Sequence, residues 1–334
     1  MRAMVFDSYG EPDVMRLRDV PVPEPQEGEI LIRVGYAGVN PADSKTRAGQ
    51  VTRRGFQNYA LPFVTGKDAA GVVERMGRNV TSFKEGDRVV TWSSSDGKTW
   101  GSYAEFVRVT AKNVSPMPRS LDFAQAAAIP IASLTAFQSL FHAEKGGLIP
   151  GQRVLVNGAA GGVGSFAVQF AKSGGVRVAA TCSTANVEYV NSLGAGRVID
   201  YKTEDVCQAV REWSSSEGVD VILDAVGPAT LPRALDMLCP GGRLINILTV
   251  TADGDIERDR EEAERRGFRK ILTVIDLERA RQSMREITRL IDDGLVHVPP
   301  TTVLLLEEAA RAHQMIDAGH VRGKLLLKVA ELSA

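Results

Sequence analysis

Four glycines close together, Gly158, Gly161, Gly162 and Gly164, form the stretch of this sequence whose residue types most clearly suggest a chemistry. They follow a short apolar run at 154–156, typical of a buried parallel strand, and they open a segment with apolar residues at helical spacing. Strand, glycine-rich turn and helix form the context that a dinucleotide-binding fingerprint requires. Such glycines let the backbone approach a pyrophosphate, and the helix start offers free N–H groups and a positive dipole end.

The turn departs from the usual G-x-G-x-x-G pattern, because Ala159 stands where the first glycine is expected. A purely structural strand-to-helix turn could use the same residues and stays open as the alternative. We nevertheless predict dinucleotide binding by this turn. The predicted contacts within it are Gly158, Ala160, Gly161, Gly162, Val163 and Gly164.

The end of the next predicted strand indicates which dinucleotide is bound. An enzyme that uses NAD usually places a carboxylate about 20 residues after the glycine turn, where it accepts a hydrogen bond from the ribose 2′-hydroxyl. Here Ser183 lies 19 positions after Gly164, and Thr184 follows it. Hydroxyl groups can donate to a 2′-phosphate, which a carboxylate would repel. The sequence therefore predicts that the bound dinucleotide is NADPH. Tyr201 could stack on the adenine or reach the 2′-phosphate, and Lys202 or Arg322 could supply positive charge there.

The elements that must position these residues fall into two halves of an α/β protein. Residues 1 to about 125 carry closely spaced short strand candidates with Gly and Pro between them, which indicates a small barrel-like β domain. From 153 to about 248, strands and helices alternate, which predicts a doubly wound parallel sheet. We expect one domain at 1–124, completed by about 295–334 through a last strand at 324–329, and a second at 125–294.

Helices are predicted wherever apolar residues recur at helical spacing. The predicted helices are 121–128 with Asp122 as N-cap or first-turn acid, 133–141, 186–193, 204–213, 231–238, 278–291 and 307–316. The charge-dense segment 253–269 has two interpretations, a surface lobe over the active site or a solvated helix.

The composition excludes several classes of protein. Of 334 residues, 44% are hydrophobic and 24% charged, which is ordinary for a globular protein. The net charge of −1 gives no electrostatic reason to expect nucleic acid or an anionic membrane as a partner. No apolar run approaches the ~20 residues that span a bilayer. We therefore expect a cytoplasmic protein.

Several ordered motifs together resemble the medium-chain dehydrogenase/reductase superfamily. They lie at 35–43, 66–73 and 159–164, and shorter matches lie at 86–89, 198–201 and 319–324. Within the superfamily the chain is similar to the zinc-independent quinone oxidoreductase, or zeta-crystallin-like, branch. The resemblance spans nearly the whole chain. It implies a GroES-like β-barrel domain and a Rossmann domain, with the active site between them.

The zinc-containing alcohol dehydrogenases of the superfamily differ at their metal ligands. They carry a Cys where this chain has Asn40, a His–Glu pair where it has Lys67 and Asp68, and another Cys near Ala132 or Ser133. A catalytic zinc needs three protein ligands, so we predict no metal. Without a Lewis acid, an alcohol is hard to oxidise. A quinone or an enone needs only a hydrogen-bond donor on its oxygen and a later proton, which fits an NADPH-dependent reductase.

The resemblance also assigns roles to single residues. Asn40 matches an asparagine beside the nicotinamide, and its amide could donate to cofactor or substrate. Asp43 and Lys45 lie on the same segment and complete the candidate catalytic set, with a helix cap and a solvated lysine as the alternatives. The candidate cofactor contacts outside the glycine turn are Asn40, Thr135, Ser183, Thr184, Tyr201, Val226, Leu248 and Arg322.

Two further expectations follow from the resemblance. Members of this branch often pair through an edge strand of the cofactor domain, so a homodimer with its contact at 271–275 is implied. A second hypothesis comes from a different class, an NADPH-binding structural or regulatory protein with little turnover. The glycine turn does not separate it from the reductase, because both would bind NADPH.

Overall fold

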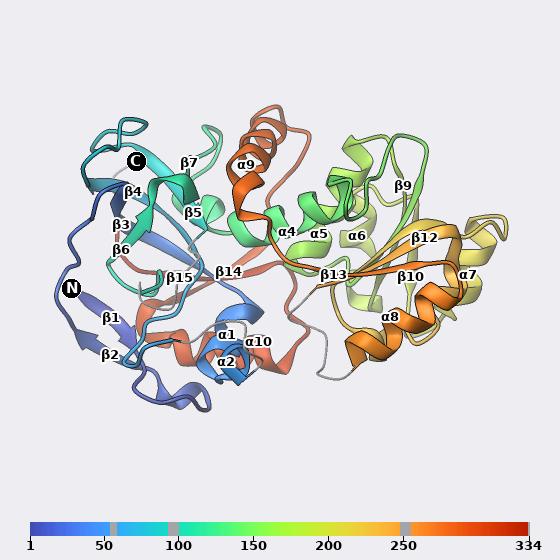
Figure 1. Ribbon diagram of the computed structural model, residues 1–334, viewed down its shortest axis with the longest axis horizontal. Coiled ribbons are helices and arrows are strands. Elements are labelled where there is room, and N and C mark those ends of the chain that lie inside the picture. Colours follow the sequence, from blue (N-terminus) through green and yellow to red (C-terminus); the bar gives the residue numbers. More distant parts are fainter. Residues whose placement is uncertain (54–58, 93–99, 248–254, 333–334) are drawn as a thin grey trace. The chain divides into compact units, whose positions relative to one another are not determined.

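The computed structural model describes residues 1–53, 59–92, 100–247 and 255–332, and the chain forms two compact units. The first unit comprises Met1–Ile131, Leu277–Asp292 and Pro300–Ala334, and the second comprises Ala132–Asp276 and Asp293–Pro299 (Figure 1). The helix predicted at 278–291 thus belongs to the first unit, although the sequence analysis expected it within the second domain.

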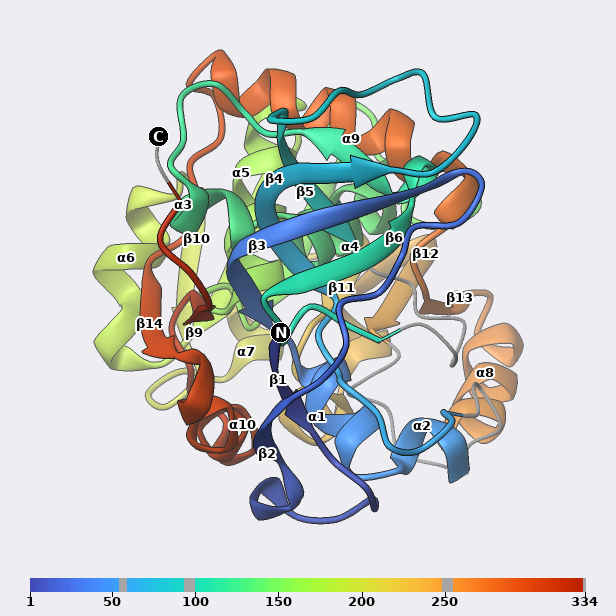
Figure 2. The same cartoon turned by 90° about the vertical axis from the view of Figure 1, so that its left-hand side faces the viewer.

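The first unit is built around one long strand, β3 (Glu29–Val39). It pairs antiparallel with β4 (Asp68–Met76) along one edge, and along the other edge with β6 (Phe106–Thr110) and then β15 (Lys324–Lys328). Figure 2 shows β3 between β4 and β6. The predicted return of the last strand to the first unit is confirmed by the pairing of β15 with β3. The remaining strands of this unit are β1 (Arg2–Val5), β2 (Arg16–Asp19), β5 (Arg88–Trp92), β7 (Val114–Pro116) and β14 (Thr301–Leu305).

Helices of the first unit are short, except the last two. They are α1 (Pro41–Arg47), α2 (Gln50–Arg53), α3 (Phe123–Ala127), α9 (Leu277–Asp292) and α10 (Ala309–Ala318). Of the two predicted roles of Asp122, the structure has the N-cap of α3, and the carboxylate accepts a hydrogen bond from the Gln125 N–H at 2.7 Å. α4 (Pro130–Phe141) begins at the end of the first unit and continues into the second.

The second unit contains a parallel six-stranded sheet in the order β10-β9-β8-β11-β12-β13. The chain reverses its direction of winding between β8 and β11, which is the doubly wound arrangement that the sequence predicts. Helices α5 and α6 cover one face, and α7 and α8 cover the other (Figure 1). The bounds are β8 (Arg153–Asn157), α5 (Gly162–Ser173), β9 (Arg177–Cys182), α6 (Val187–Ser192), β10 (Arg197–Asp200), α7 (Val206–Trp213), β11 (Val219–Asp224), β12 (Leu238–Ile247), α8 (Asp255–Arg265) and β13 (Arg269–Thr273).

One predicted helix is wrong. The segment 231–238 forms only a 3₁₀ turn at Ala234–Met237, and β12 begins directly afterwards at Leu238. Leu238 pairs with Val219 of β11, so the end of the predicted helix belongs to the parallel sheet instead. α8 agrees with the helix interpretation of the charge-dense segment.

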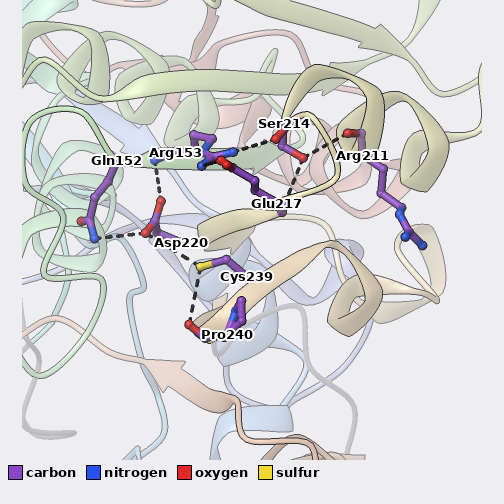
Figure 3. Close-up of polar contacts among 9 residues, drawn as sticks. Gln152, Arg153, Arg211, Ser214, Glu217, Asp220, Cys239 and Pro240 are labelled. Carbon is purple, nitrogen blue, oxygen red and sulfur yellow. Dashed lines mark hydrogen bonds and ion pairs between the residues drawn. The ribbon is translucent and has the colours of Figure 1, made fainter.

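Polar contacts join the strands at the amino edge of the parallel sheet (Figure 3). Asp220 of β11 accepts hydrogen bonds from the Arg153 N–H of β8 at 2.8 Å and from Gln152 Nε2 at 3.1 Å. Arg153 Nη1 donates to the Ser214 carbonyl at 2.8 Å, and the Cys239 thiol of β12 contacts Asp220. These contacts hold the starts of the strands together. In sheets of this kind, ligands bind at the opposite edge, outside the carboxyl ends of the strands.

Candidate active site and cofactor site

The glycine turn joins β8 to α5 through two glycines that no other residue could replace without strain. Gly158 has φ of +82°, and a Cβ there would lie 2.4 Å from Val226 Cγ2. A Cβ at Gly164 would lie 2.2 Å from the Gly158 carbonyl oxygen, so this glycine brings α5 against the turn. Both positions therefore serve the close packing of turn and helix.

Gly161 is different, because space is open in front of it. It is the N-cap of the 12-residue α5, and a Cβ there would meet only the Gly158 carbonyl oxygen, at 3.5 Å. Gly162 and Val163 follow in the first turn of α5 and are half-buried, as is Ala160. An open helix N-terminus with free N–H groups fits the pyrophosphate of a dinucleotide.

A buried network beneath the turn was missed by the sequence analysis. Asp224, at the end of β11, accepts hydrogen bonds from Asn157 Nδ2 at 2.8 Å and from Asn246 Nδ2 at 2.9 Å. Its Oδ1 also accepts from the N–H groups of Val226, at 3.1 Å, and Gly227, at 2.9 Å. The signal in the sequence was a polar residue at the end of each apolar strand. The network ties the loop after β11 to the glycine turn.

The predicted adenosine contacts lie at the ends of β9 and β10. Ser183 is half-buried and accepts a hydrogen bond from Asn186 Nδ2 at 3.0 Å, while Thr184 and Tyr201 are exposed. Asp200 ends β10, next to Cys182 of β9, and was not singled out by the sequence analysis. A hydrogen bond from the Thr184 side chain lowers the pKa of Asp200, so a carboxylate lies beside Thr184.

The other predicted cofactor contacts lie on different elements. Thr135 is half-buried in α4, and Val226 is exposed next to Gly158. Arg322 is exposed just before β15 in the first unit. Leu248 lies outside the described residues.

Asn40 lies where β3 ends and α1 begins, and the sequence fixes this junction. Pro41 disfavours a helical conformation of the residue before it, and Asn40 is extended, with φ of −125° and ψ of 152°. Pro41 itself suits the first helical position, where its missing N–H has no cost. Asn40 is almost fully buried, and its Nδ2 donates to Asp68 Oδ2 at 2.8 Å. The side chain is therefore held in a defined position.

Asp43 lies in the first turn of α1 and is fully buried. Its Oδ2 accepts the Asn40 N–H at 2.9 Å, which makes it a helix cap, and its Oδ1 lies 3.4 Å from Thr65 Oγ1. Burial raises the pKa of Asp43 to about 6; the Lys67 ammonium opposes this shift and Asp68 reinforces it. Lys45, the third predicted catalytic residue, is half-buried on the same helix.

Asp43→Asn is expected to remove a pH dependence of stability. Because the pKa of about 6 in the folded protein lies above the ordinary 3.8, folding takes up a proton between these values. The stabilisation from protonated Asp43 is therefore fully present below about pH 4 and is lost as the pH rises through about 6. A shift of this size corresponds to about 3 kcal/mol. Urea unfolding between about pH 4 and pH 7 measures it.

The comparison must be a difference between parent and variant. Burial lowers the pKa of His313 to about 3, so His313 changes stability with pH in the opposite direction. Parent minus Asp43→Asn should lose about 3 kcal/mol of unfolding free energy over this range. If the difference in unfolding free energy between parent and variant stayed constant with pH, burial would not raise the pKa of Asp43.

Comparison with known proteins assigns the family. An alcohol dehydrogenase GroES-like domain model matches residues 26–119, and a zinc-binding dehydrogenase model matches residues 193–327. The quinone oxidoreductase of Rattus norvegicus is 34% identical, over 98% of this chain and 97% of that protein. The chain belongs to the medium-chain dehydrogenase/reductase superfamily. Within it, the chain is similar to the quinone oxidoreductases, and it is an oxidoreductase.

Two further members of the superfamily differ in the cofactor that their names state. The chloroplastic NADPH-dependent alkenal/one oxidoreductase of Arabidopsis thaliana is 33% identical, over 98% of this chain and 79% of that protein. The crystal structure of an NAD-dependent alcohol dehydrogenase has a TM-score of 0.88 and 29% identity, covering 99% of this chain and 100% of that one. The solved structure confirms the predicted fold, and each of the two names states dependence on a nicotinamide dinucleotide.

The residues at the zinc position of the superfamily do not fit a zinc ion. Asp68 has a carboxylate, but its Oδ2 lies 3.2 Å from the Lys324 ammonium, a cation that would repel a metal. Asn40 and Lys67 supply no ligand that zinc prefers. Among the residues described, no group of three His, Cys, Asp or Glu side chains could hold a metal ion. A separate finding concerns membranes: in the described parts of the chain, no helix is long and apolar enough to cross one.

Proposed function

We propose that this member of the superfamily reduces a quinone or an α,β-unsaturated carbonyl compound by hydride transfer from NADPH, without a metal. The similarity over 98% of the chain to quinone oxidoreductases and to an alkenal/one oxidoreductase carries the proposal. Bound NADPH supplies the hydride. For an enone, hydride adds to the β-carbon and a proton to the α-carbon. For a quinone, hydride addition gives the hydroquinone monoanion, and one proton on oxygen then gives the hydroquinone.

Asn40 is the proposed donor to the reacting system. One N–H of its amide is used by Asp68; the other has no partner among the described residues and is available for an oxygen of the acceptor or of the cofactor. Negative charge develops on the acceptor oxygen when hydride is added, and a fixed N–H stabilises that charge more than it stabilises the substrate. Asp43 and Lys45 remain candidates for proton transfer on the same helix.

Finer properties of the protein are part of the proposal. NADPH is preferred over NADH because Ser183 and Thr184, not an acid, directly follow β9. The protein acts in the cytoplasm as a homodimer that pairs through β13. This strand forms one edge of the parallel sheet, and Val274 beside it is exposed.

Purified protein is expected to oxidise NADPH when a quinone or an enone is added. Loss of NADPH absorbance with a panel of both acceptor classes measures the activity. A chelator should leave the rate unchanged, and elemental analysis should find no stoichiometric zinc. Tight NADPH binding without turnover of any acceptor would favour the structural or regulatory alternative. Stoichiometric zinc together with activity lost on chelation would overturn the metal-free mechanism.

A further inference from the structure

A buried ion pair lies next to Asn40 and is not explained by the folding of the sheet alone. Asp68 is the first residue of β4 and Lys324 the first of β15, and both strands pair with the end of β3. The exposed fractions of Asn40, Asp68 and Lys324 are 4%, 0% and 5%. A buried ion pair adds little net stability, because desolvation offsets the attraction, so its position needs another reason.

The Lys324 ammonium has a partner for each of its three N–H groups. Nζ lies 2.6 Å from Asn40 Oδ1, 3.2 Å from Asp68 Oδ2 and 3.3 Å from the Val39 carbonyl oxygen. The second oxygen of Asp68 accepts the Ile131 N–H at 2.8 Å. Both charges are therefore fully hydrogen-bonded, which makes the arrangement rigid.

The two charges determine which way the Asn40 amide faces. Its oxygen points to the ammonium, and its nitrogen donates to the carboxylate at 2.8 Å. A flipped amide would place NH₂ against the cation and C=O against the anion, which is repulsive at both ends. Among the described residues Nδ2 donates to Asp68 alone, so its second N–H stays available in a fixed direction.

We propose that Asp68 and Lys324 form a positioning pair that orients the Asn40 amide for its hydrogen bond to the bound cofactor or acceptor. Close approach of β3 and β4 makes this possible. A Cβ at Gly38 would lie 2.8 Å from the Asp68 Cβ and 2.6 Å from the Ala127 carbonyl oxygen, so only glycine lets Asp68 reach this place. The inference rests on the proposed role of Asn40, and the pair itself transfers no proton or hydride.

A double-mutant cycle tests the pair through Asn40. Lys324→Met alone would leave a buried, unpaired carboxylate, so the test removes both charges in Asp68→Asn/Lys324→Met. With Asn40 present, this change is expected to lower kcat/KM by about 10- to 100-fold, the scale of one misplaced donor. In an Asn40→Ala background, the same change should lower kcat/KM less than about twofold. Glu24→Gln/Arg75→Met removes an exposed ion pair of the same unit and should have no effect.

Two measurements refine the test. The first shows whether the Asn40 amide binds the cofactor or the acceptor, and the second follows its position without any reaction. If the amide serves the acceptor, kcat falls and the Kd for NADPH is unchanged; if it serves the cofactor, the Kd rises as well. In protein labelled with ¹⁵N-asparagine, the Asn40 side-chain signals, assigned by their loss in Asn40→Ala, should move strongly in the double variant. This NMR arm needs no turnover, so it tests the positioning even if no acceptor is reduced.

Equal losses of kcat/KM in both backgrounds, or unmoved Asn40 signals, would overturn the inference. Should the double variant fail to fold, Lys324→Arg replaces it, because it keeps the cation but changes its geometry. Its loss of activity should again depend on the presence of Asn40. A loss that is the same in Asn40→Ala would count against the positioning role.

Discussion

Gly161→Val is expected to leave the protein folded and to weaken NADPH binding by about 100-fold or more, because several pyrophosphate hydrogen bonds to a helix N-terminus would be blocked. The backbone at Gly161, with φ of −79° and ψ of 173°, suits a β-branched residue. A Cβ there meets only one backbone atom, at 3.5 Å, so the added methyl groups extend into the space proposed for the ligand. Titration of NADPH fluorescence measures the Kd.

Gly164→Val is the matched control, and it is expected to destabilise the fold, which Gly161→Val should leave intact. A side chain there would lie 2.2 Å from the Gly158 carbonyl oxygen, so α5 must move and the fold is destabilised. Thermal unfolding should therefore separate the two variants, with a normal Tm for Gly161→Val and a lowered Tm for Gly164→Val. If folded Gly161→Val bound NADPH as tightly as the parent, the turn would not hold the pyrophosphate.

The sequence predicts the parts of this fold that depend on local pattern. The alternation of apolar runs and helical spacing from 153 onward is enough for a doubly wound sheet, and the Asp122 cap is a local signal. The failed helix at 231–238 shows the limit. The apolar residues there do have helical spacing. However, Leu238 pairs with Val219, which is distant in the sequence, and the local pattern of residues cannot predict that contact.

The site is predicted in part for the same reason. Asn40 and the glycine turn stand in recognisable motifs, whereas their supports come from elsewhere in the chain. Lys324 lies 284 positions from Asn40, and its role depends on β15 pairing with β3. Asp224 looks like any acid after an apolar strand until its partners are known. The interaction of Asp200 with Thr184 likewise depends on the pairing of β10 with β9, so the sequence around Asp200 does not predict it.

Ser183→Asp is expected to shift the cofactor preference from NADPH toward NADH. The parent should use NADPH better, because Ser183 can donate to a 2′-phosphate and no acid directly follows β9. A new carboxylate would repel the phosphate by up to about 4 kcal/mol at a separation of 4 Å near a protein surface, before screening by salt. It can also accept a hydrogen bond from the 2′-hydroxyl of NADH. The ratio of kcat/KM for NADPH to that for NADH should fall by about 30-fold or more, which corresponds to about 2 kcal/mol.

Two controls identify the charge as the cause. Ser183→Ala removes the hydroxyl without adding charge, so its ratio should fall less than about tenfold, the scale of one hydrogen bond. Asp200→Asn removes the carboxylate beside Thr184, and it should raise the preference for NADPH if that charge reaches the 2′-phosphate. Because the charge effect is electrostatic, the Ser183→Asp shift should shrink at high salt, and the Ser183→Ala shift should not. Equal or better use of NADH by the parent would disprove the assignment of Ser183 and Thr184 to a phosphate site.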